Sequence, residues 1–340
     1  WAVVVAGFIV GIPMFYSVGF VILIPLVFTV AASSGLPLIY VGLPMLASLS
    51  VTHGFLPPHP APTAISSMFN ADIGKTLLYG IIIAIPAIIV AGPLFSRTIK
   101  NINATPLKEF YNPIILKDEE MPGMGISVLT ALLPVILIIF SSIFTIIYPG
   151  DSMFKEIIVF IGNPVIAMLL SVLVAIYTLG LSLGKKMVEL MSSVSISVSS
   201  ITMVLLIISG AGALKQILID SGVSDYIGAL LDGSQISPLI LAWLIATVIR
   251  VCVGSATVAG LTAAGIILPL ISNSDVSPEL MVLAIGSGSL MLSHVNDAGF
   301  WMFKEYFNLT IKETLSTWTV METIVGVTGL IGVLILNIFI

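Results

Sequence analysis

The sequence has very little charge. Asp, Glu, Lys and Arg make up 9% of its 340 residues, whereas a soluble domain is about one quarter charged. The net charge of −5 also lacks the basic excess that a nucleic-acid-binding protein needs. These two shortages exclude a soluble globular domain, and we expect no nucleic acid among the partners of this chain.

Catalytic and metal-binding motifs are missing as well. The single cysteine, Cys252, lies in an apolar run and cannot form an internal disulfide. The sequence has no Walker A motif, no HExxH or GxSxG motif and no TVGYG filter. We therefore predict a protein that is not an enzyme, has no cofactor or metal site, and is neither ATP-driven nor a potassium channel.

Long apolar runs are what the sequence does contain. Hydrophobic residues make up 58% of the chain, and the mean hydropathy is +1.19. Several runs reach the length of about 20 residues that crosses a bilayer, among them 124–148, 157–183 and 187–209. The composition predicts an all-α, multi-pass membrane protein embedded in a lipid bilayer.

The apolar runs are interrupted, and the interruptions repeat. Each of two blocks contains a glycine break, a proline, a short polar turn, a helix and a break centred on a histidine. Equivalent positions are 242 residues apart for Trp1 and Trp243, 244 for Pro25 and Pro269, and 241 for His53 and His294. In a membrane protein this spacing predicts an internal structural repeat.

We expect two repeats joined by a linker, with the first beginning before Trp1. The first comprises residues 1–99, with a hairpin (1–32), a broken helix (35–70) and a span (76–96). Residues 100–122 form the linker. The second comprises residues 123–340, with a hairpin (237–273), a broken helix (278–310) and a final span (314–339).

The basic residues indicate how the repeats are oriented. If the polar stretch 97–122 is cytoplasmic, eight basic residues lie inside and three lie outside, as the positive-inside rule expects. The inside set is Arg97, Lys100, Lys108, Lys117, Lys185, Lys186, Lys304 and Lys312, and the outside set is Lys75, Lys155 and Lys215. The two hairpins then enter from opposite sides. Inverted repeats with broken helices are typical of secondary transporters.

The two break loops contain all three histidines: His53, His59 and His294. A break leaves backbone N–H and C=O groups that lipid cannot satisfy. Such groups are tolerated where they line a wet cavity or bind a solute. We favour a binding site, because two breaks at matching positions both carry polar residues. The alternative is that the prolines only kink helices that are buried in protein.

The tip of the second hairpin is built from small residues, Gly254, Ser255, Ala256 and Thr257. Small residues let backbone N–H groups approach a ligand, and helix N-termini favour anions. The alternative is close helix packing.

Two charged residues lie near this tip and the second break. Arg250 lies one turn before the tip; it either attracts a carboxylate substrate or pairs with Asp297 or Glu322. Asp297, next to Asn296, is a candidate both to carry a proton and to cap the helix that begins near Phe300, and the two roles are compatible.

Four segments carry a close resemblance to the gluconate permease family, the gluconate:proton symporters. They are residues 52–60 (THGFLPPHP), 69–76 (FNADIGKT), 254–259 (GSATVA) and 293–301 (SHVNDAGFW). The resemblance implies a bacterial inner-membrane symporter of the ion transporter superfamily. It also implies inverted repeats, two opposed hairpins and an elevator-like movement. The basic residues, and not the resemblance, predict the cytoplasmic linker at 97–122 and a periplasmic C-terminus. The family includes carriers for other sugar acids and for D-serine.

We therefore expect a secondary active transporter that imports gluconate or a related sugar acid by proton symport. Its partners would be a small anionic solute, protons and the bilayer, with a homodimer expected by analogy alone. The alternatives are a carrier for D-serine or another small hydroxy or amino acid, and a passive channel or membrane scaffold. Uptake against a gradient that a protonophore abolishes would separate these classes.

The expected site combines the breaks and the second tip. Arg250 would balance charge, and the candidates for proton coupling are Asp297, His294 and position Ser17, where the family usually has Glu. The expected substrate-binding residues are Thr52, His53, Gly54, Ser255, Ala256, Thr257, Asn296 and Asp297.

Overall fold

The computed structural model describes residues 1–105, 122–148, 152–196, 237–270 and 276–340, with a few isolated positions between them. Every regular element in these ranges is a helix. In chain order they are α1 (Ala2–Gly11), α2 (Tyr16–Ser34), α3 (Leu38–Phe55), α4 (Pro60–Met68), α5 (Ile73–Ile89), the π-helix η1 (Val90–Leu94), α6 (Phe95–Thr98), α7 (Met124–Ile147), α8 (Met153–Gly162), α9 (Pro164–Thr178), the 3₁₀ turn η4 (Leu181–Leu183), α12 (Pro238–Val253), α13 (Ala256–Leu270), α14 (Pro278–Gly288), α15 (Ala298–Tyr306), α16 (Ile311–Thr314), the π-helix η5 (Leu315–Thr319) and α17 (Val320–Leu336).

Six helical stretches of the described chain are long and apolar enough to cross a membrane. They are Tyr16–Ser34, Leu38–Met68, Ile73–Thr98, Met124–Thr145, Val165–Leu183 and Ile311–Leu336. The prediction of an all-helical, multi-pass membrane protein agrees with this arrangement. Most of the predicted linker and part of the predicted span 187–209 lie outside the described residues.

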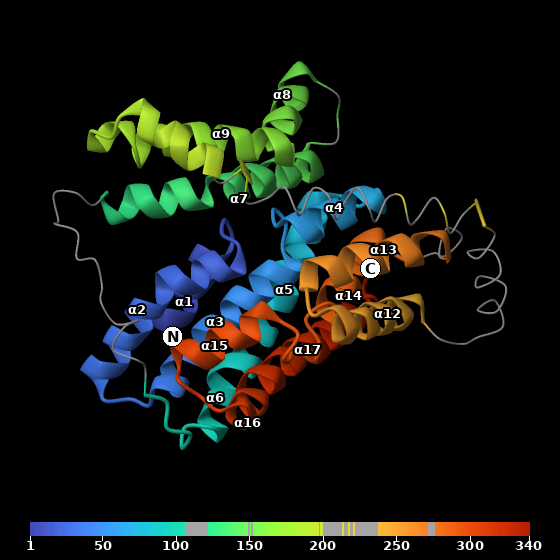
Figure 1. Ribbon diagram of the computed structural model, residues 1–340. Helices are drawn as coiled ribbons and strands as arrows, with labels where there is room; N and C mark the ends of the chain where they lie inside the picture. The colour runs from blue at the N-terminus through green and yellow to red at the C-terminus, as the bar shows by residue number, and fades with distance from the viewer. Residues whose placement is uncertain are drawn as a thin grey trace.

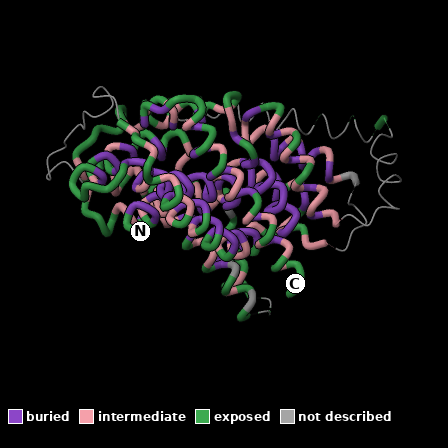
Figure 2. Tube along the Cα trace, turned by 90° about the horizontal axis from the view of Figure 1, so that it is seen from below, coloured by how far each residue is buried: buried purple, intermediate pink, exposed green. Residues whose placement is uncertain are grey.

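The helices form a central body with a separate group along one side. Helices α7, α8 and α9 lie together above the body in Figure 1, and α7 packs against α5. In the body, α3 and α14 are buried along most of their length, and the buried trace runs through the middle of the molecule (Figure 2). Large apolar side chains on the outside, such as Ile85 and Phe140, are more than half exposed. A bilayer would cover such a surface.

The two broken helices, α3 and α14, cross at a pair of glycines. A Cβ added to Gly286 would lie 2.5 Å from the carbonyl oxygen of Gly54. A Cβ added to Gly54 would lie 2.5 Å from Leu290 Cδ1. The two backbones can approach this closely only because both positions lack a side chain. The crossing brings the end of α3 next to the end of α14, where both helices break.

Two stretches of the chain have the same order of elements. The nine-residue helices α4 and α15 both end at a Phe-Asn pair, and both asparagines are left-handed, with φ of 53° at Asn70 and 51° at Asn308. The helix that follows is capped by Asp72 in one stretch and by Thr310 in the other. The sequence analysis missed this second set of matching positions.

The second half of the first broken helix begins inside the proline run: α4 starts at Pro60, because proline fits the first turn, where its missing N–H is not needed. One predicted span was wrong. The predicted span 157–183 is two helices, α8 and α9. Asn163 divides them, since its Oδ1 accepts from Val165 N at 3.0 Å and starts a new helix with Pro164 in its first turn.

Replacing Gly286 with alanine should destabilise the protein. The added methyl group meets the Gly54 carbonyl, and overpacking of this kind costs about 1–3 kcal/mol. Gly125→Ala is the matched control, because a Cβ there meets nothing within 4 Å. Thermal unfolding in detergent should show a lower midpoint for Gly286→Ala than for the unmodified protein, and no decrease for Gly125→Ala. Equal midpoints for the two variants would contradict the close crossing.

Candidate functional site

An open cavity of about 560 Å³ lies where the interrupted helices meet. Its walls come from the start of α2, from α3, from the tip between α12 and α13, from the break before α15, and from η5 and α17. The polar and charged residues that line it are Tyr16, Ser17, Ser50, His53, Arg250, Ser255, Thr257, Asn296, Asp297, Trp318 and Glu322.

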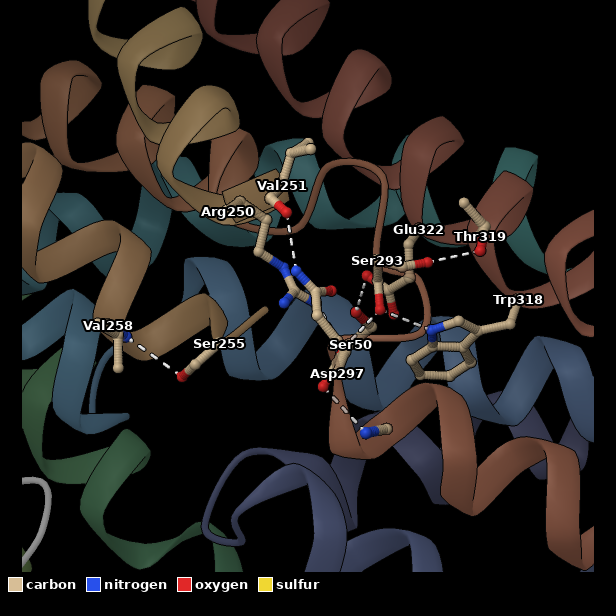
Figure 3. Close-up of polar contacts among 12 residues, drawn as sticks. Ser50, Arg250, Val251, Ser255, Val258, Ser293, Asp297, Trp318, Thr319 and Glu322 are labelled. Carbon is tan, nitrogen blue, oxygen red and sulfur yellow. Dashed lines mark hydrogen bonds and ion pairs between the residues drawn. The ribbon is translucent and has the colours of Figure 1, made fainter. Parts of the chain in front are cut away.

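A buried ion pair forms one wall of the cavity. Arg250 Nη2 lies 2.5 Å from Asp297 Oδ2, and the exposed fractions of the two side chains are 3% and 17% (Figure 3). The same oxygen accepts from Ser293 Oγ at 2.5 Å, and Asp297 Oδ1 accepts from Gly299 N at 3.0 Å. Of the alternatives that the sequence left open, the structure selects Asp297 as the partner of Arg250. It also makes Asp297 the cap of α15, which begins at Ala298.

Ser293 connects this pair to the π-helix before α17. Trp318 Nε1 donates to Ser293 Oγ at 2.7 Å, and Thr319 Oγ1 donates to the Ser293 carbonyl at 2.5 Å. Trp318 is in the π-helical segment, and Thr319 is its last residue. The break before α15 is therefore held from two sides, by α12 and by η5.

The tip of the second hairpin is held against the same break. Gly254 ends α12 with a φ of 82°, a left-handed conformation that favours glycine. A Cβ at this position would overlap the backbone carbonyl of Asn296. The Asn296 amide in turn donates from Nδ2 to the Val251 carbonyl at 2.8 Å. Thus Gly254 lets the tip approach the break, and Asn296 closes the last turn of α12.

Several buried polar atoms at the cavity have no partner among the described residues. They are Nε and Nη1 of Arg250, the hydroxyl of Tyr16 and Nδ1 of His53. All three residues line the cavity. Because buried polar groups in proteins are almost always hydrogen-bonded, these atoms are the candidates to donate to, or accept from, a polar ligand or water in the cavity.

The two histidines of the first break, His53 and His59, make different contacts. His59 Nε2 lies 2.7 Å from the Gly11 carbonyl oxygen, so it ties the break to the end of α1. The His53 ring packs edge-on against the His59 ring, with centroids 5.1 Å apart, and faces the cavity. The cavity lining does not include His294.

Most of the predicted site residues are brought together, and two of the exceptions have a clear structural role. The Thr52 hydroxyl donates to backbone carbonyls of its own helix, Ser48 at 3.1 Å and Leu49 at 2.9 Å. Gly54 lies where α3 crosses α14, and its lack of a side chain leaves room for Leu290. The predicted site residues in the lining are Ser17, His53, Arg250, Ser255, Ala256, Thr257, Asn296 and Asp297.

Four polar lining residues were not among the predicted site residues: Tyr16, Ser50, Trp318 and Glu322, the last named from the sequence only as a possible partner of Arg250. Tyr16 is adjacent to Ser17 at the start of α2, and this neighbour was the available clue. Ser50 and Trp318 stand in apolar helices with no motif around them. Among the described residues, no group of three or more His, Cys, Asp or Glu side chains could hold a metal ion.

Comparison with known proteins identifies the family. The model of the GntP family permease matches residues 1–339. The chain belongs to the GntP permease family. Because this is a family of permeases, the prediction of a carrier rather than an enzyme is confirmed.

Relatives of this permease are similar over nearly its whole length. The chain is 54% identical over 337 residues to the high-affinity gluconate transporter of Escherichia coli strain K12, covering 99% of this chain and 77% of the relative. It is 50% identical over 337 residues to the Gnt-II system L-idonate transporter of the same strain, with the same coverage. It is 48% identical over 347 residues to the gluconate permease of Bacillus subtilis strain 168, covering 99% and 78%.

Removing one member of the buried ion pair should strongly destabilise the permease. Arg250→Ala leaves Asp297 without its cation, at a cost of about 3–5 kcal/mol. Adding Asp297→Asn should recover part of that loss, and chemical unfolding in detergent would measure the double-mutant cycle.

The matched control for this cycle is Glu305→Ala. It breaks the exposed Lys304–Glu305 pair at 2.8 Å and should cost less than about 1 kcal/mol. Equal costs for the two single variants would show that the buried pair does not stabilise the fold.

Proposed function

We propose that this permease is a secondary active transporter that imports gluconate or a related sugar acid by proton symport. The observation that carries the proposal is the buried Arg250 guanidinium beside a cavity of about 560 Å³, with Nε and Nη1 unpartnered among the described residues. A planar guanidinium recognises a carboxylate through paired N–H donors. Relatives named for gluconate and for L-idonate support a hydroxylated carboxylate as the solute.

In this proposal the two ends of the solute meet different walls. The carboxylate faces Arg250 and the Tyr16 hydroxyl, whose unpartnered atoms supply the donors. The solute hydroxyls face Ser255, Thr257 and Asn296. The N-termini of α2 and α13 also meet the cavity, and the positive end of a helix dipole favours an anion.

The proposed architecture is a pair of inverted repeats with an elevator-like movement. Two features support it: the same order of elements in the two stretches, with left-handed Asn70 and Asn308, and the meeting of both hairpin tips at one cavity. The basic residues support a cytoplasmic linker at 97–122 and a periplasmic C-terminus, in the cell inner membrane. A homodimer rests on analogy with other elevator carriers.

Uptake by purified permease in liposomes tests the function. With an inward proton gradient, gluconate should accumulate above its outside concentration, and a protonophore should abolish the accumulation. L-Idonate should compete more strongly than D-serine. Downhill flux that a protonophore leaves unchanged would indicate a channel. Stronger competition by D-serine than by L-idonate would indicate that the solute is an amino acid and not a sugar acid.

Replacing Tyr16 with phenylalanine should weaken solute binding without destabilising the fold. The Tyr16 hydroxyl is buried and has no partner among the described residues, so its removal costs no internal hydrogen bond. Loss of one hydrogen bond to the solute should raise the Kd for gluconate about tenfold, the equivalent of about 1.4 kcal/mol.

The exposed Tyr177 provides the matched control. Tyr177→Phe should leave both the Kd and the unfolding midpoint unchanged. If Tyr16→Phe lowers the unfolding midpoint while the Kd stays the same, the hydroxyl is structural and not a ligand for the solute.

A further inference from the structure

The cavity contains a second acid that the ion pair does not use. Glu322 lies in the first turn of α17 and is 2% exposed. Its Oε2 accepts from Ser50 Oγ at 2.8 Å (Figure 3). Within the described part of the chain, this is its single hydrogen bond. Glu322 is therefore a buried carboxyl group at a polar cavity, held by one neutral hydroxyl.

The two acids of the cavity differ in how their charge is compensated. Asp297 accepts from a guanidinium, a hydroxyl and a backbone N–H, the set of donors that suits a carboxylate. Among the residues that the structure describes, no cation forms an ion pair with Glu322. A buried acid without such a partner is stabilised when a proton neutralises it.

The net charge of the cavity depends on whether Glu322 is ionised. The other titratable or charged groups that face this cavity are Arg250 from α12, Asp297 from the break, Tyr16 from α2 and His53 from α3. Helices α5 and α14 also pack against α17 but contribute no residue to the lining among those described. Because Arg250 and Asp297 neutralise each other, an ionised Glu322 would leave the cavity negative.

A negative cavity repels an anionic solute, and a proton on Glu322 removes the repulsion. Linkage then works in both directions: protonation strengthens anion binding, and anion binding favours protonation by the same factor. The two events are coupled although the proton and the solute do not touch.

We propose that Glu322 carries the coupled proton, an inference that rests on the gluconate:proton symport proposed above. The carboxylate takes one proton from the side on which gluconate enters, forming a neutral carboxylic acid beside Ser50. It releases that proton on the other side when gluconate leaves. No other bond forms or breaks.

The test measures gluconate binding as a function of pH and counts the protons taken up, by calorimetry in buffers of different ionisation enthalpy. At a pH where Glu322 is ionised in the empty cavity, the unmodified permease should take up about one proton per gluconate, and over that pH range its Kd should rise by up to about tenfold per pH unit. Glu322→Gln resembles the neutral acid, so its Kd should not change with pH and its proton uptake should be lost. In liposomes, a pH gradient should no longer drive accumulation by this variant.

Two further variants complete the test. Glu322→Asp should restore a pH-dependent Kd, and Glu305→Gln, an exposed acid outside the cavity, should behave like the unmodified permease. Proton uptake that persists in Glu322→Gln would overturn the inference and leave the symport proposal standing. Gluconate binding without proton uptake in the unmodified permease would overturn both the inference and symport. No gluconate binding in the unmodified permease would refute the proposed substrate instead.

Discussion

The geometry of the cavity depends on the buried ion pair between Arg250 and Asp297. The pair joins the last turn of α12 to the break before α15, two segments 47 residues apart in the chain. Removing both charges from water is costly unless the remaining lone pairs are also satisfied. Ser293 and the N–H of Gly299 satisfy those of Asp297. Because the pair holds the tip and the break face to face, their polar groups line one space.

The ion pair satisfies only part of the hydrogen-bonding capacity of the Arg250 guanidinium. One of its nitrogens binds Asp297, while Nε and Nη1 have no partner among the described residues. A buried polar group without a partner costs about 1–3 kcal/mol. A fold retains such a cost where a ligand removes it, and the unpartnered Tyr16 hydroxyl in the same lining fits this interpretation. In the proposed function, the fold and the solute site share one residue, Arg250, which uses different nitrogens for the ion pair and for the solute.

Sequence patterns predicted several of the residues that line the cavity, but they did not resolve which neighbouring side chains face it. The small-residue tip and the second break were predicted, and Ser255, Thr257 and Asn296 all line the cavity. Thr52 was predicted on the same grounds, yet its hydroxyl bonds to its own helix. A motif fixes which residues are adjacent in the chain, whereas the rotation of a helix about its axis depends on what packs around it.

The sequence by itself determined that this chain is a multi-pass helical membrane protein with interrupted helices and small polar tips. Hydropathy, proline and glycine act locally, so these features can be found without knowledge of the fold. Only the tertiary structure decided which polar groups meet. Ser50 and Glu322 are 272 residues apart and lie in apolar helices. A lone acid in an apolar run makes Glu322 a candidate, but no local pattern indicates that Ser50 is its partner. Their contact exists because α3 and α17 pack against each other, and packing between distant segments is a property of the whole chain.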